Sequence, residues 1–150
     1  MIRGVLAVCV GNLCRSPMTE GLLRQAMPGM NVTSAGIRAR IGMAADPYAV
    51  STMLLHHIDI SGHRSQPLSS ALCAAHDVMF VMDDTLKQHV LNRHPQLRGR
   101  VHLLDPAGIA DPYRQPYELF VDCYERIAAA VDAWHPRLRA LLGTSARDMS

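Results

Sequence analysis

The chain carries VLAVCVGNLCRSP at residues 5–17, and this stretch decides the fold that we expect. The run at residues 5–8 is wholly apolar, which is typical of a strand buried on both faces. Pro17 is favoured at the first position of a helix, because its missing N–H costs nothing there. Between the two lies a short turn that begins at Cys9 and ends at Ser16. The stretch therefore predicts a buried strand, a tight turn and a helix in direct succession.

The same alternation of strand-like and helical segments continues along the chain. Asp46 and Pro47 are typical of an N-cap and of the first helical position. Apolar residues three or four positions apart from Phe120 to Leu141 predict a long final helix, which Pro136 should kink or split. We expect strands at residues 5–9, 31–35, 77–82 and 101–104, and helices at residues 17–27, 46–57, 69–75, 84–93 and from residue 116.

Alternating strands and helices predict an α/β fold with a parallel sheet that is covered by helices on both faces. We expect one three-layer domain over residues 1–150, with four parallel strands in the flavodoxin-like order 2-1-3-4. Residues 144–150 are expected to form a loose tail. In such a sheet the ligand site lies beyond the carboxyl end of the first strand, where the strand order reverses. Cys9 stands at that point.

Composition excludes several classes of protein. About half of the residues are apolar and about a fifth are charged, which is ordinary for a soluble globular domain. The net charge of +2, from 15 basic and 13 acidic residues, is too weak to predict nucleic-acid binding. No apolar run is long enough to span a membrane, and the first one is too short for a secretory signal. We therefore expect a cytoplasmic protein that is not embedded in a membrane.

The cysteine pattern does not indicate a metal site or a disulfide framework. Cys9, Cys14, Cys73 and Cys123 form no C-x-x-C pair, and we expect Cys73 and Cys123 to lie in the core. Cys73 and His76 are spaced like a pair of zinc ligands, but zinc sites need four converging ligands. We expect neither a metal nor another cofactor.

The turn after the first strand has the features of an anion site. Backbone N–H groups and the start of a helix converge there, and Gly11 and Asn12 tolerate the left-handed conformations that a curled loop needs. Arg15 can hold two phosphate oxygens at once. The same groups stabilise a thiolate at Cys9, which would lie in line with a bound phosphorus atom. The loop predicts phosphoryl transfer through a phosphocysteine. Its phosphate-binding residues would be Val10, Gly11, Asn12, Leu13, Cys14 and Arg15.

The motif CVGNLCRSP followed by T-E resembles the signature loop of the low-molecular-weight protein tyrosine phosphatases. The resemblance extends to SAG at residues 34–36, GH at 62–63, MD at 82–83 and DPY at 111–113, so it covers about residues 1–142. The variants CVGN and DPYR are most similar to bacterial members that act with tyrosine autokinases in exopolysaccharide assembly. The resemblance implies a phosphotyrosine protein as substrate, with a membrane tyrosine autokinase as the candidate partner.

The resemblance also implies roles for three catalytic residues: Cys9 is the nucleophile, Arg15 clamps the phosphate, and Asp111 is the general acid. The chemistry asks for such an acid independently, because a departing tyrosinate has a pKa near 10 and needs a proton. Asp111 follows the last predicted strand in an exposed-looking loop, where it can hang over the pocket. The same carboxylate could then activate the water that hydrolyses the phosphocysteine.

Supporting roles follow from the same resemblance. Ser16 would hydrogen-bond the thiolate, and three further residues would brace the loop, namely Asn12, Ser34 and His63. Tyr113 and Arg40 would form the pocket rim. Family members often carry an aromatic or aliphatic residue where this chain has Arg40, and a basic rim would favour acidic phosphopeptides.

Cys14 is a candidate redox partner for Cys9, because the two lie five residues apart on one curled loop. Geometry alone leaves two alternatives open: a disulfide after oxidation of Cys9, or simple packing beneath the loop. The resemblance implies the disulfide, since family members use an adjacent loop cysteine in this way. Tyr117 and Tyr124 are candidate phosphorylation sites, although Tyr124 lies one step from the apolar stripe and could pack instead.

Two other functions fit part of this pattern. A thiol-coupled arsenate reductase shares the fold and the C-x5-R loop, but it needs two more cysteines near the third strand, where this chain has Cys73 alone. A non-catalytic phosphotyrosine-binding module would need neither a nucleophile nor an acid, whereas this chain has Cys9 and Asp111.

Overall fold

The computed structural model describes residues 2–149, and the side chains of residues 2–141. It contains one parallel sheet in the order β2-β1-β3-β4, built from β1 (Val5–Cys9), β2 (Val32–Gly36), β3 (Val78–Val81) and β4 (Val101–Leu103). The predicted strand order is confirmed. Since β1 pairs with both β2 and β3, the order reverses at its carboxyl end, where Cys9 lies opposite Gly36.

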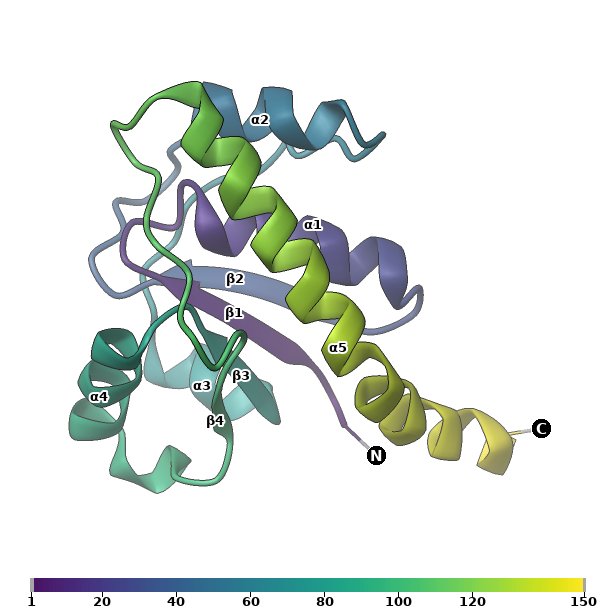
Figure 1. Ribbon diagram of the computed structural model, residues 1–150. Coiled ribbons are helices and arrows are strands. Elements are labelled where there is room, and N and C mark those ends of the chain that lie inside the picture. Colours follow the sequence, from purple (N-terminus) through teal and green to yellow (C-terminus); the bar gives the residue numbers. More distant parts are fainter. Residues whose placement is uncertain (1, 150) are drawn as a thin grey trace.

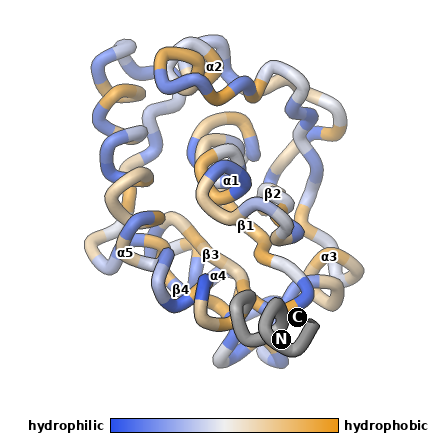
Figure 2. Tube along the Cα trace, turned by 90° about the vertical axis from the view of Figure 1, so that its right-hand side faces the viewer, coloured by the Kyte–Doolittle hydropathy of each residue, from blue (hydrophilic) through white to orange (hydrophobic). Residues whose placement is uncertain are grey.

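Helices cover both faces of this sheet, as the alternating pattern predicts. The helices are α1 (Arg15–Ala26), α2 (Pro47–Leu54), α3 (Ser70–Ala75), α4 (Asp84–Arg93) and α5 (Tyr117–Met149), with a short 3-10 turn η1 (Pro95–Leu97). Helices α1 and α5 lie on one face of the sheet, and α3 and α4 lie on the other (Figures 1 and 2). Helix α2 packs beside the beginning of α5 (Figure 1).

Capping residues explain where three of the helices begin. The carboxylate of Asp46 accepts a hydrogen bond from the N–H of Tyr48, and Pro47 takes the first helical position. The side chains of Ser69 and Asp83 cap α3 and α4 in the same way. Helix α2 ends three residues before the predicted position. The reason is local, since the backbone at His57 is left-handed, with φ of 63°.

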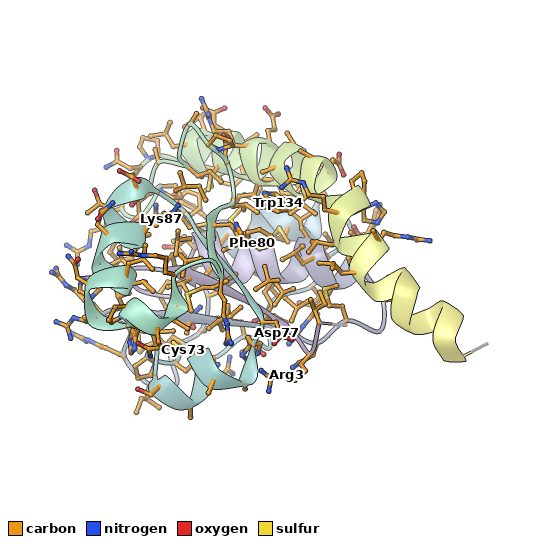
Figure 3. All side chains as sticks on the ribbon, turned by 90° about the horizontal axis from the view of Figure 1, so that it is seen from below. Arg3, Cys73, Asp77, Phe80, Lys87 and Trp134 are labelled. Carbon is orange, nitrogen blue, oxygen red and sulfur yellow. The ribbon has the colours of Figure 1, made fainter. Side chains whose placement is uncertain are left out.

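Helix α5 bends at Pro136 (Figure 1), so the kink that the sequence predicts is confirmed. It continues past Pro136 as one helix, although its later part points in another direction (Figures 1 and 3), because a proline removes one backbone hydrogen bond without ending the neighbouring ones. Residues 144–149, for which we expect a loose tail, continue this helix, which ends at Met149. Among these residues Ala146, Arg147 and Met149 favour helix. Ser150 lies outside the described residues.

The core lies mainly between the sheet and the α1–α5 layer. Residues 5–8 are fully buried, and Phe80 on β3 packs edge-on against Trp134 of α5 at 4.8 Å (Figure 3). The indole N–H of Trp134 donates to the carbonyl of Leu104, which ties α5 to the end of β4. None of the described helices is both long and apolar enough to cross a bilayer.

Gly36 offers a direct test of how tightly β2 fits the loop after β1. A Cβ atom at Gly36 would lie 2.5 Å from the carbonyl oxygen of Val10 and 2.8 Å from the N–H nitrogen of Asn12. Both are backbone atoms that cannot turn away. We expect Gly36→Ala to lower the free energy of unfolding by about 1–3 kcal/mol, measured by urea denaturation.

Gly62→Ala is the matched control. A Cβ atom there would meet nothing within 4 Å and the backbone is not left-handed, so its stability should stay within about 0.5 kcal/mol of the parent or rise slightly. Equal urea midpoints for the two variants would show that the loop after β1 can shift to accommodate a Cβ atom at residue 36.

Candidate active site

The loop from Cys9 to Ser16 curls around the sulfur of Cys9. The backbone at Asn12 is left-handed, with φ of 57°, and its N–H points at Cys9 Sγ across 3.2 Å. Ser16 Oγ lies 2.9 Å from the same sulfur. Ser16 Oγ accepts a hydrogen bond from Asn12 Nδ2, and its own proton has two acceptors in reach, the sulfur of Cys9 and the more distant carbonyl oxygen of Ala35 at 3.5 Å. The two donors and the start of α1 together favour a thiolate at this position.

Asn12 is the centre of the hydrogen bonds that hold this curl. Its side chain is fully buried and donates to Ser16 Oγ at 2.8 Å and to Ser34 Oγ at 2.9 Å. His63 Nε2 lies 2.7 Å from the carbonyl oxygen of Asn12, so the imidazole N–H donates to it. The structure therefore brings together the four residues that we expected to act as supports of the loop.

Gln66 belongs to the same network and was missed by sequence reasoning. Its backbone N–H donates to Asn12 Oδ1 at 3.0 Å, and its side-chain amide donates to the carbonyl of Ser34 at 3.0 Å. Every residue except proline has a backbone N–H, so no sequence signal could identify the contact that this N–H makes with Asn12.

Arg15 is buried, with 2% of its side chain exposed, and it contacts the two segments that follow β3 and β4. Its Nη1 donates to the carboxylate of Asp83 at 3.0 Å and to the carbonyl of Ile109 at 2.9 Å, and its Nη2 lies 3.6 Å from Asp111. Arg15 Nε is buried and has no hydrogen-bond partner among the described residues. An unpaired donor on a buried guanidinium is costly, so this edge of Arg15 is suited to an anionic ligand.

Asp83, which belongs to the MD pair of the family resemblance, also lies at the site, but as a partner of Arg15, a role that the sequence did not predict. One carboxylate oxygen caps α4 by accepting from the N–H of Leu86, and the other binds Arg15. A carboxylate directly after the strand that pairs with β1 is the signal that could have placed it, because the carboxyl ends of parallel strands share one edge of the sheet.

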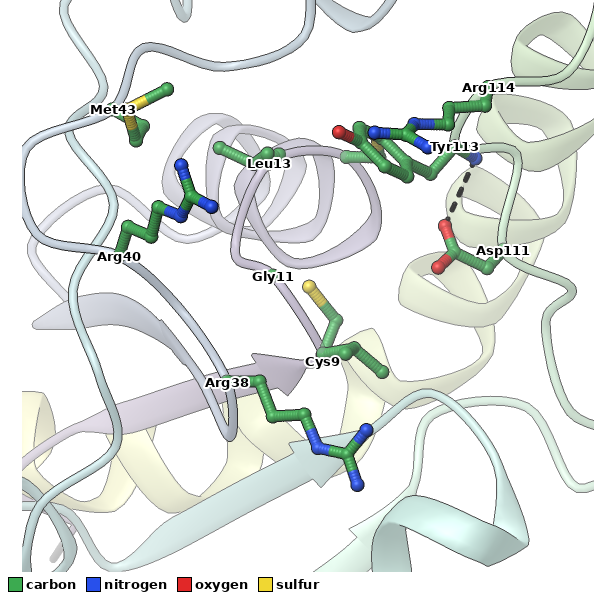
Figure 4. A pocket seen from close by; sticks show the side chains of 11 residues that line it. Cys9, Gly11, Leu13, Arg38, Arg40, Met43, Asp111, Tyr113 and Arg114 are labelled. Carbon is green, nitrogen blue, oxygen red and sulfur yellow. Dashed lines mark hydrogen bonds between the residues drawn. The ribbon is translucent and has the colours of Figure 1, made fainter.

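Asp111 follows β4 and faces the pocket above Cys9 (Figure 4). One carboxylate oxygen accepts a hydrogen bond from the N–H of Tyr113 at 3.1 Å, and the other lies near Arg15. Its side chain is 42% exposed, so a substrate can reach it. The three predicted catalytic residues therefore lie around one pocket.

The pocket has a volume of about 310 Å³ and combines an apolar wall with a basic mouth. The expected rim residues Arg40 and Tyr113 both line it, and so do Arg38 and Arg114, which were not expected (Figure 4). Its other lining residues are Cys9, Val10, Gly11, Leu13, Cys14, Met43 and Asp111.

The other thiols lie in environments that keep them protonated. Burial, with Asp46 and Asp111 nearby, raises the pKa of Cys14 far above its ordinary value. Burial likewise raises the pKa of Cys123 to about 12. All four cysteines are free, and the prediction that Cys73 and Cys123 lie in the core is confirmed. Within the described residues no group of three or more His, Cys, Asp or Glu side chains could hold a metal ion.

The two tyrosines at the start of α5 both contact other rings. Tyr124 stacks on His56, with ring centroids 3.8 Å apart and an angle of 12° between the planes, and burial raises its pKa. Tyr117 makes an edge contact with Tyr48 at 5.4 Å. Tyr124 thus packs, as the alternative reading of the sequence allowed, whereas phosphorylation of either residue stays a prediction.

Comparison with known proteins identifies the family. The family model of the low molecular weight phosphotyrosine protein phosphatases matches residues 4–143. A Ralstonia nicotianae protein named "Probable low molecular weight protein-tyrosine-phosphatase EpsP" is 49% identical over 144 residues, which are 94% of this chain and 99% of that protein.

Solved structures agree with this match. The structure of Vibrio vulnificus Wzb in complex with benzylphosphonate is 37% identical, with a TM-score of 0.86 over 89% of this chain and 97% of that one. The YwlE arginine phosphatase from Geobacillus stearothermophilus is 28% identical, with a TM-score of 0.86 over 91% of this chain and 92% of that one. The chain thus belongs to the low molecular weight phosphotyrosine protein phosphatase family.

Proposed function

We propose that this protein hydrolyses phosphotyrosine in protein substrates through a phosphocysteine at Cys9. The observation that carries the proposal is the juxtaposition of two groups in one pocket. Cys9 Sγ receives hydrogen bonds from the curled loop, and the buried guanidinium of Arg15 keeps one unpaired donor at Nε. A phosphoryl group held by the loop N–H groups and by Arg15 would have the sulfur directly behind its phosphorus.

In the first step the Cys9 thiolate attacks phosphorus, so a P–S bond forms as the bond to the tyrosine oxygen breaks. Asp111 gives its proton to that departing oxygen. The ion pair between Arg15 and Asp111 is long, with Nη2 and the carboxylate oxygen 3.6 Å apart. A bound phosphate would compete with Asp111 for this guanidinium. Asp83 is less suited to be the acid, because its two oxygens already accept from Arg15 and from the cap of α4.

In the second step water attacks phosphorus and the P–S bond breaks. The Asp111 carboxylate takes a proton from this water, and inorganic phosphate and the Cys9 thiolate are formed. The thiolate is a better leaving group when Ser16 and the N–H of Asn12 donate to it. The loop geometry thus serves both steps.

The pocket wall favours an aryl phosphate over phosphoarginine, the substrate class suggested by the name of the YwlE neighbour. Leu13 and Tyr113 line the wall with apolar surface that suits a tyrosine ring. The cationic guanidinium of phosphoarginine would instead face the three arginines of the pocket mouth. Neither an arsenate reductase nor a binding module is favoured, since the family match and the relatives' names both indicate a phosphatase.

We further infer that the enzyme works in the cytoplasm on a membrane tyrosine autokinase. Two observations support this. The motif variants CVGN and DPYR resemble the bacterial members that act with such kinases, and the chain is 49% identical to EpsP. A tyrosine-phosphorylated autokinase domain is therefore the first protein substrate to test.

Cys9→Ser tests the proposed function directly. We expect the parent to hydrolyse a phosphotyrosyl peptide and p-nitrophenyl phosphate, and a phosphoarginyl peptide much more slowly. Cys9→Ser should lose all multiple turnover but still bind the phosphotyrosyl peptide, because the loop N–H groups and Arg15 remain. Measurable turnover by Cys9→Ser, or faster hydrolysis of phosphoarginine by the parent, would contradict the proposal.

Asp111→Ala should impair catalysis in proportion to how badly the leaving group needs a proton. With phenyl phosphate, whose leaving group has a pKa near 10, we expect the first step to slow about 10²- to 10⁴-fold. With p-nitrophenyl phosphate the loss should be much smaller, because that leaving group departs readily as an anion. Burst kinetics on both substrates isolates the first step. An equal loss with both would mean that Asp111 only positions its loop.

We expect Cys14 to protect Cys9 from irreversible oxidation. Peroxide would oxidise the Cys9 thiolate to a sulfenic acid, and the Cys14 thiol would then displace its hydroxyl as water to form a disulfide. Mass spectrometry after mild peroxide should find this bond, and dithiothreitol should restore activity. After dithiothreitol, Cys14→Ala should recover far less activity than the parent. The control variant Cys73→Ala should recover as much activity as the parent. Full recovery by Cys14→Ala would leave Cys14 a packing role only.

A further inference from the structure

Three arginines surround the mouth of the pocket. Arg38 and Arg40 belong to the segment after β2, and Arg114 belongs to the segment after Asp111. Figure 4 shows Arg40 on one side of Cys9 and Arg114 with Tyr113 on the other, while Arg38 lies below Cys9. These charges are not used by the phosphoryl chemistry, which needs Arg15 alone.

The three guanidinium groups have no acidic partner in the part of the chain that the structure describes, where the ion pairs involve other residues. Asp111 is the one carboxylate among the residues that line the pocket, and it lies beside Arg15. Burial, followed by the charges of Arg93 and Arg38, lowers the pKa of His89 on α4. The mouth of the pocket is therefore electropositive.

The segment that carries Arg40 is fixed in place by Ser65, which is buried. The Ser65 hydroxyl donates to the carbonyl of Arg40 and accepts from the N–H of Met43 at 2.9 Å. Backbone hydrogen bonds join Ser65 to Met43 and Gly42 at 2.8 Å each. The next residue along, Gln66, holds Asn12 in the loop. The neighbouring residues Ser65 and Gln66 thus hold both the Arg40 segment at the mouth of the pocket and the loop at its floor.

Arg114 lies on the opposite side of the pocket from Arg40, and its backbone has a costly left-handed conformation. Its φ is 62°, a left-handed value that favours glycine, yet the chain has an arginine there. Its guanidinium lies 5.3 Å from the centroid of the Tyr113 ring, within range of a cation–π contact. The positive charge on this side therefore has a defined place beside the ring that would contact a bound tyrosine.

We propose that Arg38, Arg40 and Arg114 bind aspartate and glutamate side chains that flank the phosphotyrosine in the substrate. This inference rests on the proposed function and names the substrate class for it. The pocket has room for one phosphotyrosine side chain, and arginines on both of its sides would meet carboxylates before and after that residue in the peptide. Guanidinium groups without an acidic partner are suited to carboxylates.

Binding to the Cys9→Ser protein tests the proposal without relying on turnover. Two fluorescent phosphotyrosyl peptides are compared, one with Asp and Glu at the flanking positions and the other with Asn and Gln. Each exposed ion pair is expected to contribute about 1.4- to 5-fold, so the acidic peptide should bind about 10-fold more tightly at low salt. At 1 M salt the preference should nearly vanish, since the screening length falls to about 3 Å.

Variants that remove single or several charges, made in the Cys9→Ser protein, identify which residues cause the preference for the acidic peptide. In the triple variant Arg38→Gln, Arg40→Gln and Arg114→Gln, the acidic-to-neutral binding ratio should fall to about one. Arg98→Gln is the control for the loss of a single positive charge: it removes one guanidinium near η1, at the amino end of the sheet, and should leave the ratio unchanged. Arg114→Gly should reduce the ratio without lowering the melting temperature, because glycine accepts the left-handed backbone.

The outcomes separate this inference from the proposed function. Equal binding of the two peptides by Cys9→Ser at low salt, or a ratio that falls as much in Arg98→Gln as in the triple variant, would overturn the role of the three arginines. Failure of the parent to hydrolyse either phosphotyrosyl peptide would instead overturn the proposed function, while the binding ratio would still decide the role of the arginines.

Discussion

A buried positive charge is the constraint on which the rest of this site depends. A guanidinium that is 2% exposed is stable only when fixed partners replace its water. The partners of Arg15 come from two distant segments, with Asp83 after β3, and Ile109 and Asp111 after β4. All of them gather at the carboxyl edge of one parallel sheet. The charge can be buried only when β3 and β4 have joined the sheet beside β1, so a functional pocket requires contacts from both ends of the chain.

Much of this fold can be predicted from local signals in the sequence. The apolar run before Cys9 predicts β1, and Asp46 followed by Pro47 predicts the start of α2, because each depends only on near neighbours. The position of Cys9 at the reversal of strand order then places the pocket. Boundaries are less predictable: His57 takes a left-handed backbone that is rare for non-glycine residues, and α2 ends early.

The parts of the site that sequence reasoning missed are contacts between distant segments. Asp83 binds an arginine 68 positions earlier, and the backbone N–H of Gln66 binds a side chain 54 positions earlier. The Gln66 contact has no local pattern, and the Asp83 contact is indicated only by the position of Asp83 after β3. Arg114 was missed for a different reason, since its place at the pocket depends on a left-handed backbone that sequence does not reveal. The resemblance to a family supplied Ser34 and His63, which local patterns would not have indicated.

The carboxylate of Asp83 binds two groups at once, and this couples opening of the first turn of α4 to the occupancy of the pocket. One oxygen holds the first turn of α4 and the other holds Arg15. Fraying of that turn therefore withdraws the partner of the guanidinium, and a well-held guanidinium keeps the turn closed. An anion that orders Arg15 would slow the exchange of the amide hydrogens at the start of α4, although this helix lies on the face of the sheet opposite α1 and α5. The empty and occupied states of the pocket would then differ in local stability on that far face without any change of fold.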